Sequence, residues 1–122
     1  MRTLVNKVQL IGNLGEDPIV KELDNEKIVA KFSMATNETY KSKDGEKVTN
    51  TQWHRIVAWG AIARIVKQYL HKGDKIAIEG RLNHRSYEHE GNTRYVTEVV
   101  VTDLLMLSSK HADKPAEDNA PF

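Results

Sequence analysis

The segment from Thr51 to Gly60 combines two tryptophans and an arginine at alternating positions. Alternate side chains of a β-strand share a face, so one face carries Trp53, Arg55, Val57 and Trp59, and the other carries His54, Ile56 and Ala58. Two indoles and a guanidinium on one face form a stacking platform with a phosphate partner, which is what unpaired nucleic acid bases require. The alternative is that both tryptophans are core residues. The arginine between them opposes this alternative, because an unpaired guanidinium is unfavourable in a core.

Two further segments place an aromatic residue beside basic residues. Tyr40 precedes Lys41, Lys43 and Lys47 in a loop region, and Arg85 precedes Tyr87 before a second loop. Exposed lysines are usually only solvated surface, so each segment alone indicates little. Together with the two tryptophans, they predict a larger surface for stacking bases and holding phosphates.

The sequence shows no catalytic or metal-binding constellation. There are five histidines and no cysteine, and the spacing of His84 and His89 matches no standard metal motif. His54 lies on the strand face opposite the tryptophans, which favours a structural or interfacial role. No nucleophile with a base, no phosphate-cradling glycine loop and no paired carboxylates stand out. We therefore expect a protein that is not an enzyme and needs no metal or cofactor.

Most of the chain shows the alternation of half-buried strands. Apolar residues alternate with polar ones in the segments 4–11, 27–36 and 74–82, and the segment 95–107 is denser in Val and Leu. The segment Ala61–Leu70 instead places Ile62, Ile65, Val66 and Tyr69 on one stripe of a helix. Turn residues, including Lys43-Asp44-Gly45 and Glu90-Gly91-Asn92, separate the strands.

The order of these elements predicts the fold class. Three strands, a helix and two further strands give an all-β OB-fold, a five-stranded Greek-key barrel with one helix between strands 3 and 4. Residues 1–109 would form this domain. The polar residues 110–122 would form a short flexible C-terminal tail, because they contain too little apolar surface to offset the entropy of ordering.

Composition limits the remaining possibilities. The 122 residues suit one domain, with 29% charged and 39% hydrophobic residues. The formal net charge of +1 provides no overall basic field, so an anion site must come from local arrangement. No apolar run suggests a signal peptide or a membrane span. We expect a cytoplasmic, nucleoid-associated protein without a membrane partner.

Several ordered segments resemble those of the bacterial single-stranded DNA-binding proteins. The resemblance runs from Val5 to Leu107 through the segments 5–8, 12–18, 35–38 followed by Tyr40, 53–57, 69–73, 78–80, 94–95 and 97–100. A series of segments in the right order is far more specific than one short motif. The terminal Pro121-Phe122 behind Glu117 and Asp118 is similar to the acidic tip of that family.

The resemblance implies a homotetramer that wraps single-stranded DNA. Base-stacking aromatics of the family fall at Tyr40, Trp53, Trp59 and Tyr87, and its basic backbone contacts fall at Lys7, Arg55, Lys72 and Arg85. His54 falls at a position between subunits. The tail residues Glu117, Asp118, Pro121 and Phe122 would recruit replication and repair proteins, through an apolar anchor and acidic charge. With only two acidic residues near its tip, this recruitment would be weak and salt-sensitive.

We therefore expect a sequence-tolerant single-stranded DNA-binding protein that coats and protects DNA in replication, recombination and repair. A primosome-type OB-fold interaction protein is one alternative, although the tryptophan pair and the terminal Pro-Phe oppose it. An RNA-binding OB module is another alternative with the same fold.

Overall fold

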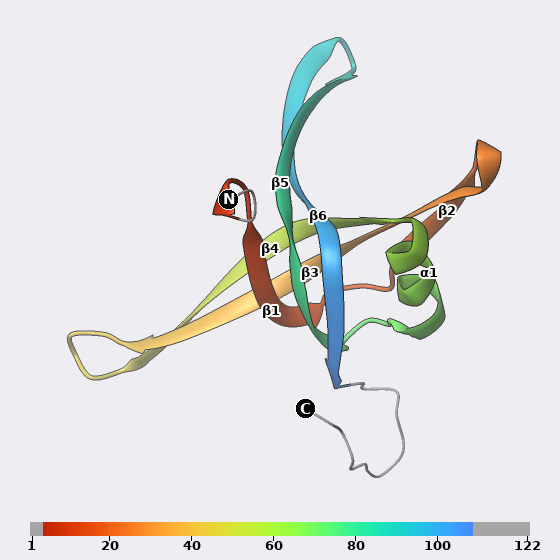
Figure 1. The fold of residues 1–122 in the computed structure, drawn as a ribbon. Helices are drawn as coiled ribbons and strands as arrows, with labels where there is room; N and C mark the ends of the chain where they lie inside the picture. The colour runs from red at the N-terminus through yellow and green to blue at the C-terminus, as the bar shows by residue number, and fades with distance from the viewer. Residues whose placement is uncertain (1–3, 109–122) are drawn as a thin grey trace.

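The chain folds into a barrel with two long hairpins, as Figure 1 shows for the computed structural model, which describes residues 4–108. The strands are β1 (Val8–Leu14), β2 (Ile19–Leu23), β3 (Lys27–Lys41), β4 (Lys47–Trp59), β5 (Lys75–His89) and β6 (Asn92–Ser108). The helix α1 (Gly60–Tyr69) follows β4, and one 3-10 turn, Asp24–Glu26, follows β2. The predicted tail, 110–122, lies outside the described residues.

The strand order confirms the OB-fold. The sheet runs β1-β5-β6-β4-β3-β2, and an additional pairing of β1 with β3 closes five of the strands into a barrel. All pairings are antiparallel except the short parallel contact between β4 and β6. The helix lies between the third and fourth barrel strands, as predicted. The strand β2, which is outside the five-stranded barrel, is short and pairs with the first part of β3.

Closure of the barrel depends on a glycine in β1. Asn13 and Leu14 pair with Ala35 and Met34 of β3, while the preceding residues of β1 pair with β5. A Cβ atom on Gly12 would overlap the backbone carbonyl oxygen of Ala35. Only glycine therefore lets β1 come close enough to pair with β3 at this corner, where Asn13 pairs with both β3 and β5.

The core follows the predicted alternation. Ile28, Ala30, Phe32 and Met34 of β3 are buried, and Ile56 and Ala58 of β4 join them in one cluster with residues of β5, β6 and α1. Burial of the inner face removes apolar surface from water and stabilises the barrel. It also fixes which side chains of β4 point outward.

The helix buries a different stripe from the predicted one. Ala63 and Val66 are buried and Ile62 is half-buried, whereas Ile65 and Tyr69 are exposed. The prediction of Ile65 and Tyr69 on the packed stripe was therefore wrong. Apolar residues lie on both sides of Val66, so the helical period alone does not fix the rotation. The small Ala63 faces the barrel because α1 packs closely against β3, β4 and β6.

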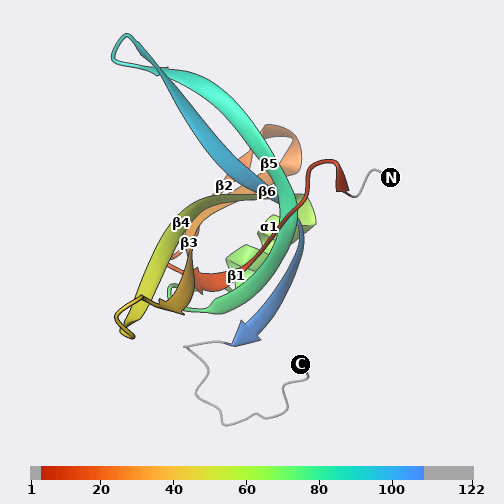
Figure 2. The same ribbon diagram turned by 90° about the vertical axis from the view of Figure 1, so that its left-hand side faces the viewer.

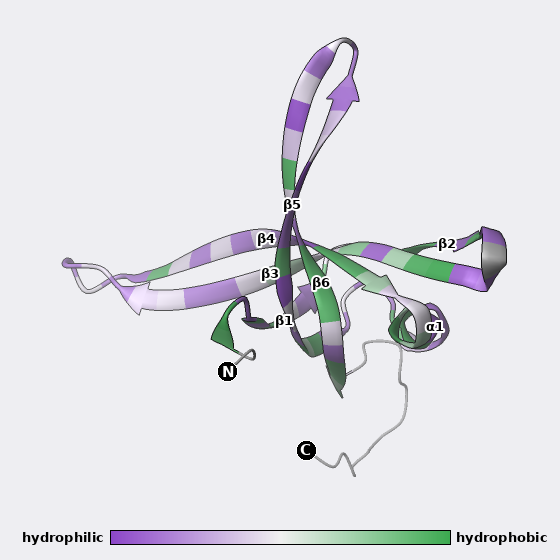
Figure 3. Cartoon of the chain, turned by 45° about the horizontal axis from the view of Figure 1, so that its top comes forward, coloured by the Kyte–Doolittle hydropathy of each residue, from purple (hydrophilic) through white to green (hydrophobic). Residues whose placement is uncertain are grey.

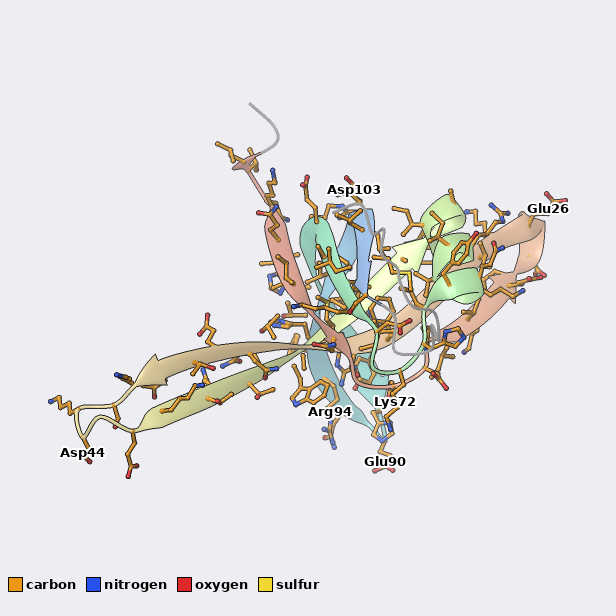
Figure 4. All side chains as sticks on the ribbon, turned by 90° about the horizontal axis from the view of Figure 1, so that it is seen from below. Glu26, Asp44, Lys72, Glu90, Arg94 and Asp103 are labelled. Carbon is orange, nitrogen blue, oxygen red and sulfur yellow. The ribbon has the colours of Figure 1, made fainter. Side chains whose placement is uncertain are left out.

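Two hairpin arms project from the barrel in different directions (Figures 1 and 2). One arm is formed by β3 and β4, with Asp44 at its tip, and the other by β5 and β6, with Glu90 at its tip (Figure 4). The ends of both arms are mainly hydrophilic (Figure 3). Within residues 4–108, we find no helix with the length and apolar character that crossing a membrane requires.

Candidate nucleic-acid interface

The outer face of β4 carries both tryptophans, as the alternation predicts. Trp53 is 62% exposed and Trp59 is 48% exposed, and Arg55 between them is also exposed. Val57 is the exception, because it is only 4% exposed although it shares this face. Six residues of extended strand separate the indoles by roughly 20 Å. They therefore offer two separate stacking positions rather than one stacked pair.

Gly15 forms the floor beneath the Trp53 indole. A Cβ atom on Gly15 would overlap the Cζ3 atom of the Trp53 ring. The backbone N–H of Gly15 donates a hydrogen bond of 3.0 Å to the carbonyl of Ser33, which holds the turn after β1 against β3. The sequence presents Gly15 only as a turn residue, and its contact with Trp53 depends on the closed barrel.

A groove beside Arg55 brings together charges that are far apart in the sequence. Arg55 of β4 and Arg85 of β5 both line a depression of about 410 Å³ on the outer surface. Its lining also includes Lys31 of β3 and two acidic residues, Glu16 and Glu98. Three cations against two carboxylates leave the lining with one net positive charge, so a phosphate site here depends on the placement of the arginines rather than on a strong basic field.

Within this groove, Arg85 is held by Glu98. The Nε–H of Arg85 donates to Oε1 of Glu98 at 3.2 Å, and its Nη2–H donates to Oε2 at 2.9 Å. The Glu98 side chain is 8% exposed and that of Arg85 is 42% exposed. The guanidinium also lies 5.8 Å from the centre of the Tyr87 ring. The predicted phosphate contact is thus already paired with a carboxylate.

The pair keeps both groups charged. The hydrogen bonds from Arg85 lower the pKa of Glu98, and the hydrogen bonds to Glu98 raise the pKa of Arg85. Since the folded pKa of Glu98 is lowered, its contribution to stability is present above the pKa of the unfolded chain. That contribution is lost as the pH falls through the lowered pKa.

Glu98 is a site residue that the interpretation of the sequence missed. Counting outward from the two-residue turn Glu90-Gly91 pairs Arg85 with Val96 and Asn83 with Glu98. Arg85 and Glu98 are then diagonal neighbours on one face of the hairpin, within reach of long side chains. The turn residues were recognised, so this pairing could have been found by extending the register.

Tyr40 does not share the face of Trp53. The register pairs Tyr40 with Val48 and Ala35 with Trp53 without interruption. Alternation along β3 places Tyr40 on the same side of the arm as Met34 and His54. Tyr87, in contrast, lies on the Arg85 side of the other arm. Three of the four predicted aromatics therefore lie on the outer face of β4 or on the Arg85 side of the β5–β6 arm, at separate positions.

The two predicted lysines lie outside the groove. The ammonium of Lys7 is 3.7 Å from the carboxylate of Glu79, beside β1 and β5. Lys72 lies in the turn after α1, where its backbone N–H donates to Oδ1 of Asp17 at 2.8 Å; Figure 4 labels its side chain. This turn is bonded to the end of β1, next to the loop that carries Gly15.

His54 lines a second depression, of about 350 Å³, between β4 and the base of the β5–β6 arm. Its Nε2 lies 2.9 Å from the hydroxyl of Thr36. The depression also includes Leu82 and Tyr95, and Tyr95 is 82% exposed. Trp53 and Arg55 line it as well, so it adjoins the outer face of β4. Among residues 4–108, no group of three or more His, Cys, Asp or Glu side chains could hold a metal ion.

A family model now places this geometry among known proteins. The model, described as the single-strand binding protein family, matches residues 5–107. The chain belongs to this family. Its predicted tail residues Glu117, Asp118, Pro121 and Phe122 lie beyond both the matched and the described residues.

Curated relatives agree with the family. The chain is 45% identical over 116 residues to single-stranded DNA-binding protein 1 of Chlorobaculum tepidum, which covers 93% of this chain and 72% of that protein. It is 46% identical over 115 residues to the single-stranded DNA-binding protein of Bacteroides thetaiotaomicron, with 92% and 71% covered.

Solved structures share the fold. A single-strand binding protein of Plasmodium falciparum in complex with ssDNA superposes with a TM-score of 0.79 at 32% identity, covering 88% of this chain and 99% of that one. A deletion mutant of the single-stranded DNA-binding protein from Thermus aquaticus gives a TM-score of 0.75 at 24% identity, covering 87% and 52%. The second likeness supports the fold alone.

The contact between Gly15 and Trp53 gives a first prediction for this family member. Gly15→Ala pushes the end of the indole outward, which changes the emission of Trp53, measured in a Trp59→Phe background. Because a side chain rather than backbone moves, the free energy of unfolding changes by no more than about 0.5 kcal/mol. Gly12→Ala is the contrast, since its clash with backbone destabilises the barrel by about 1–3 kcal/mol. Unchanged Trp53 emission in Gly15→Ala would contradict the contact.

Proposed function

We propose that this chain binds single-stranded DNA along the outer face of β4 and the adjoining groove. The observation that carries this proposal is the exposed pair of Trp53 and Arg55 on one strand face, beside a groove lined by Arg85. The indole offers a flat apolar surface to an unpaired base, and the guanidinium offers hydrogen bonds to the phosphate beside it. Membership of the single-strand binding protein family supports the same role.

The proposed binding is tolerant of sequence. Every base has a π-face that can stack on Trp53, Trp59 or Tyr87, and the phosphate backbone is the same at each nucleotide. Such a protein coats and protects unpaired strands during replication, recombination and repair. The role is one of binding rather than catalysis, and it uses no metal or cofactor. It places the protein in the cytoplasm, associated with the nucleoid.

Substitutions on β4 test this proposal. Trp53→Ala weakens binding to poly-dT by roughly 1–3 kcal/mol, because one stacked base is lost. Arg55→Ala also weakens binding, and it reduces the slope of log affinity against log salt by about 0.7, the value for one phosphate contact on a single strand. Both effects are measured by fluorescence titration at several salt concentrations.

Two variants on the exposed side of α1 are matched controls. Tyr69→Ala removes an exposed aromatic and Lys67→Ala an exposed cation, neither of which lines the groove or the pocket beside Trp59, and each leaves the affinity for poly-dT within error of wild type. Competition between poly-dT and poly-U distinguishes an RNA-binding module, for which poly-U is preferred.

A Trp53→Ala variant that binds normally but melts at a much lower temperature contradicts the stacking role.

We further propose that the chain assembles into a homotetramer. Two separate surfaces carry exposed apolar side chains: the depression with Leu82 and Tyr95, and the outer side of the barrel with Ile11 and Leu105. A tetramer with three two-fold axes can be built from two different self-complementary interfaces. Four barrels on one strand would raise the apparent affinity through effective concentration.

The depression that contains His54 provides the test of assembly. His54→Asp adds a charge where a second copy would cover apolar surface, so the oligomer dissociates at micromolar concentration in light scattering. Apparent affinity for long poly-dT then falls mainly at low protein concentration. Ala61→Asp, on the exposed first turn of α1, is the control and keeps the oligomer. A wild-type protein that is monomeric at these concentrations refutes the assembly.

Residues 110–122 are proposed to act as a tail that recruits replication and repair proteins. The support is chemical: Phe122 and Pro121 are apolar residues in an otherwise polar segment, and Glu117 and Asp118 add negative charge. An apolar side chain beside acidic residues suits an apolar pocket with a basic rim on a partner. The acidic residues are repelled by the phosphates of DNA.

Deleting Pro121 and Phe122 tests this role. The truncated protein binds poly-dT as tightly as wild type or slightly more tightly, because the acidic segment opposes DNA binding. Capture of helicases, primase or nucleases from a lysate is lost, and the weak capture by wild type decreases with added salt. Retention of the same partners by the truncated protein means that they dock on the barrel.

A further inference from the structure

Glu98 is an unexpected residue in a groove that is proposed to hold phosphates. It lies among Lys31, Arg55 and Arg85 in the lining, and its carboxylate repels any anion placed there. Its side chain is almost completely buried, while the paired Arg85 is partly exposed to the groove. The hydrogen bonds from Arg85, together with the positive charges of Arg85 and Lys31, lower the pKa of Glu98, so the carboxylate is charged at neutral pH.

The hydrogen bonds show which N–H donors of Arg85 the pair uses and how many remain. Both carboxylate oxygens of Glu98 accept bonds from Arg85. A guanidinium has five N–H donors, so three donors of Arg85 are not needed for this pair and can face a second acceptor. The charge of Arg85 is balanced by Glu98, however. The pair thus presents hydrogen-bond donors to the groove with no net charge.

The neighbouring arginine differs in this respect. Within the described residues, no carboxylate forms an ion pair with Arg55. Arg55 therefore brings an unbalanced positive charge to the outer face. Arg85 instead brings N–H donors in a fixed orientation, and Glu98 balances its charge. Two arginines of one groove should then contribute differently to the salt dependence of binding.

We propose that Glu98 limits the affinity of the groove for single-stranded DNA by competing with phosphate for Arg85. This inference rests on the proposed function. A phosphate that approaches Arg85 must share the guanidinium with a buried carboxylate, so the contact adds little net attraction. Glu98 also positions Arg85 beside Tyr87. The competition makes the contact easy to release, which suits a protein that must leave the strand when it is copied or repaired.

The decisive experiment compares poly-dT binding by wild type, Glu98→Gln and Glu22→Gln between low and high salt. Glu98→Gln frees one cation, so binding tightens and the log–log salt slope steepens by about 0.7, which makes its advantage grow about fivefold for each tenfold drop in salt. Glu22 pairs with Lys67 at 3.2 Å between β2 and α1. Glu22→Gln therefore makes the same change in net charge away from the groove, and it leaves the slope unchanged.

A second variant separates the freed charge from other effects. In Arg85→Gln/Glu98→Gln, the freed cation is absent, so the additional slope seen in Glu98→Gln disappears. Circular dichroism verifies that each variant is folded at the assay temperature, and Glu98→Met serves in place of Glu98→Gln if the latter is not. Glu98→Gln that binds no more tightly than wild type, with an unchanged slope, overturns the inference and leaves Glu98 only a structural partner of Arg85. Failure of wild type and Glu22→Gln to bind poly-dT refutes the proposed function instead.

Discussion

The close backbone approach of β1 to β3 at Gly12 is the constraint on which the rest of the structure depends. It closes the sheet, and closure sets the inner face of β3 and β4 against β5, β6 and α1. The same corner carries the turn that brings Gly15 beneath Trp53. A residue with a Cβ atom at position 12 would therefore disturb both the core and the stacking position, although it touches neither.

Much of the architecture could be predicted because alternation is a local property. The even positions of β3 and the faces of β4 follow from the sequence, and so does the helix after β4. Tyr40 has the same parity as Ile28 and Met34, so the alternation that placed Trp53 also separates Tyr40 from it. That separation follows from the sequence alone.

Partners across the barrel could not be predicted in the same way. The contact of Gly15 with Trp53 joins the turn after β1 to β4 through closure of the sheet. The groove brings Arg55 of β4 near Arg85 of β5 because both strands pair with β6. Neither is a local property of the chain. The rotation of α1 about its axis could not be predicted either. Ile65 and Ala63 lie on opposite sides of Val66 around the helix, and only packing against the barrel determines that the Ala63 side is buried.

The two hairpin arms differ mechanically from the barrel that carries them. Beyond the barrel, each arm is a two-stranded ribbon whose side chains are mostly exposed on both faces. Bending such a ribbon disrupts few buried contacts, whereas bending the barrel opens its core. The molecule thus combines a stiff centre with compliant extensions. A polymer that follows the arms can change its curvature while the geometry around Trp53 is conserved.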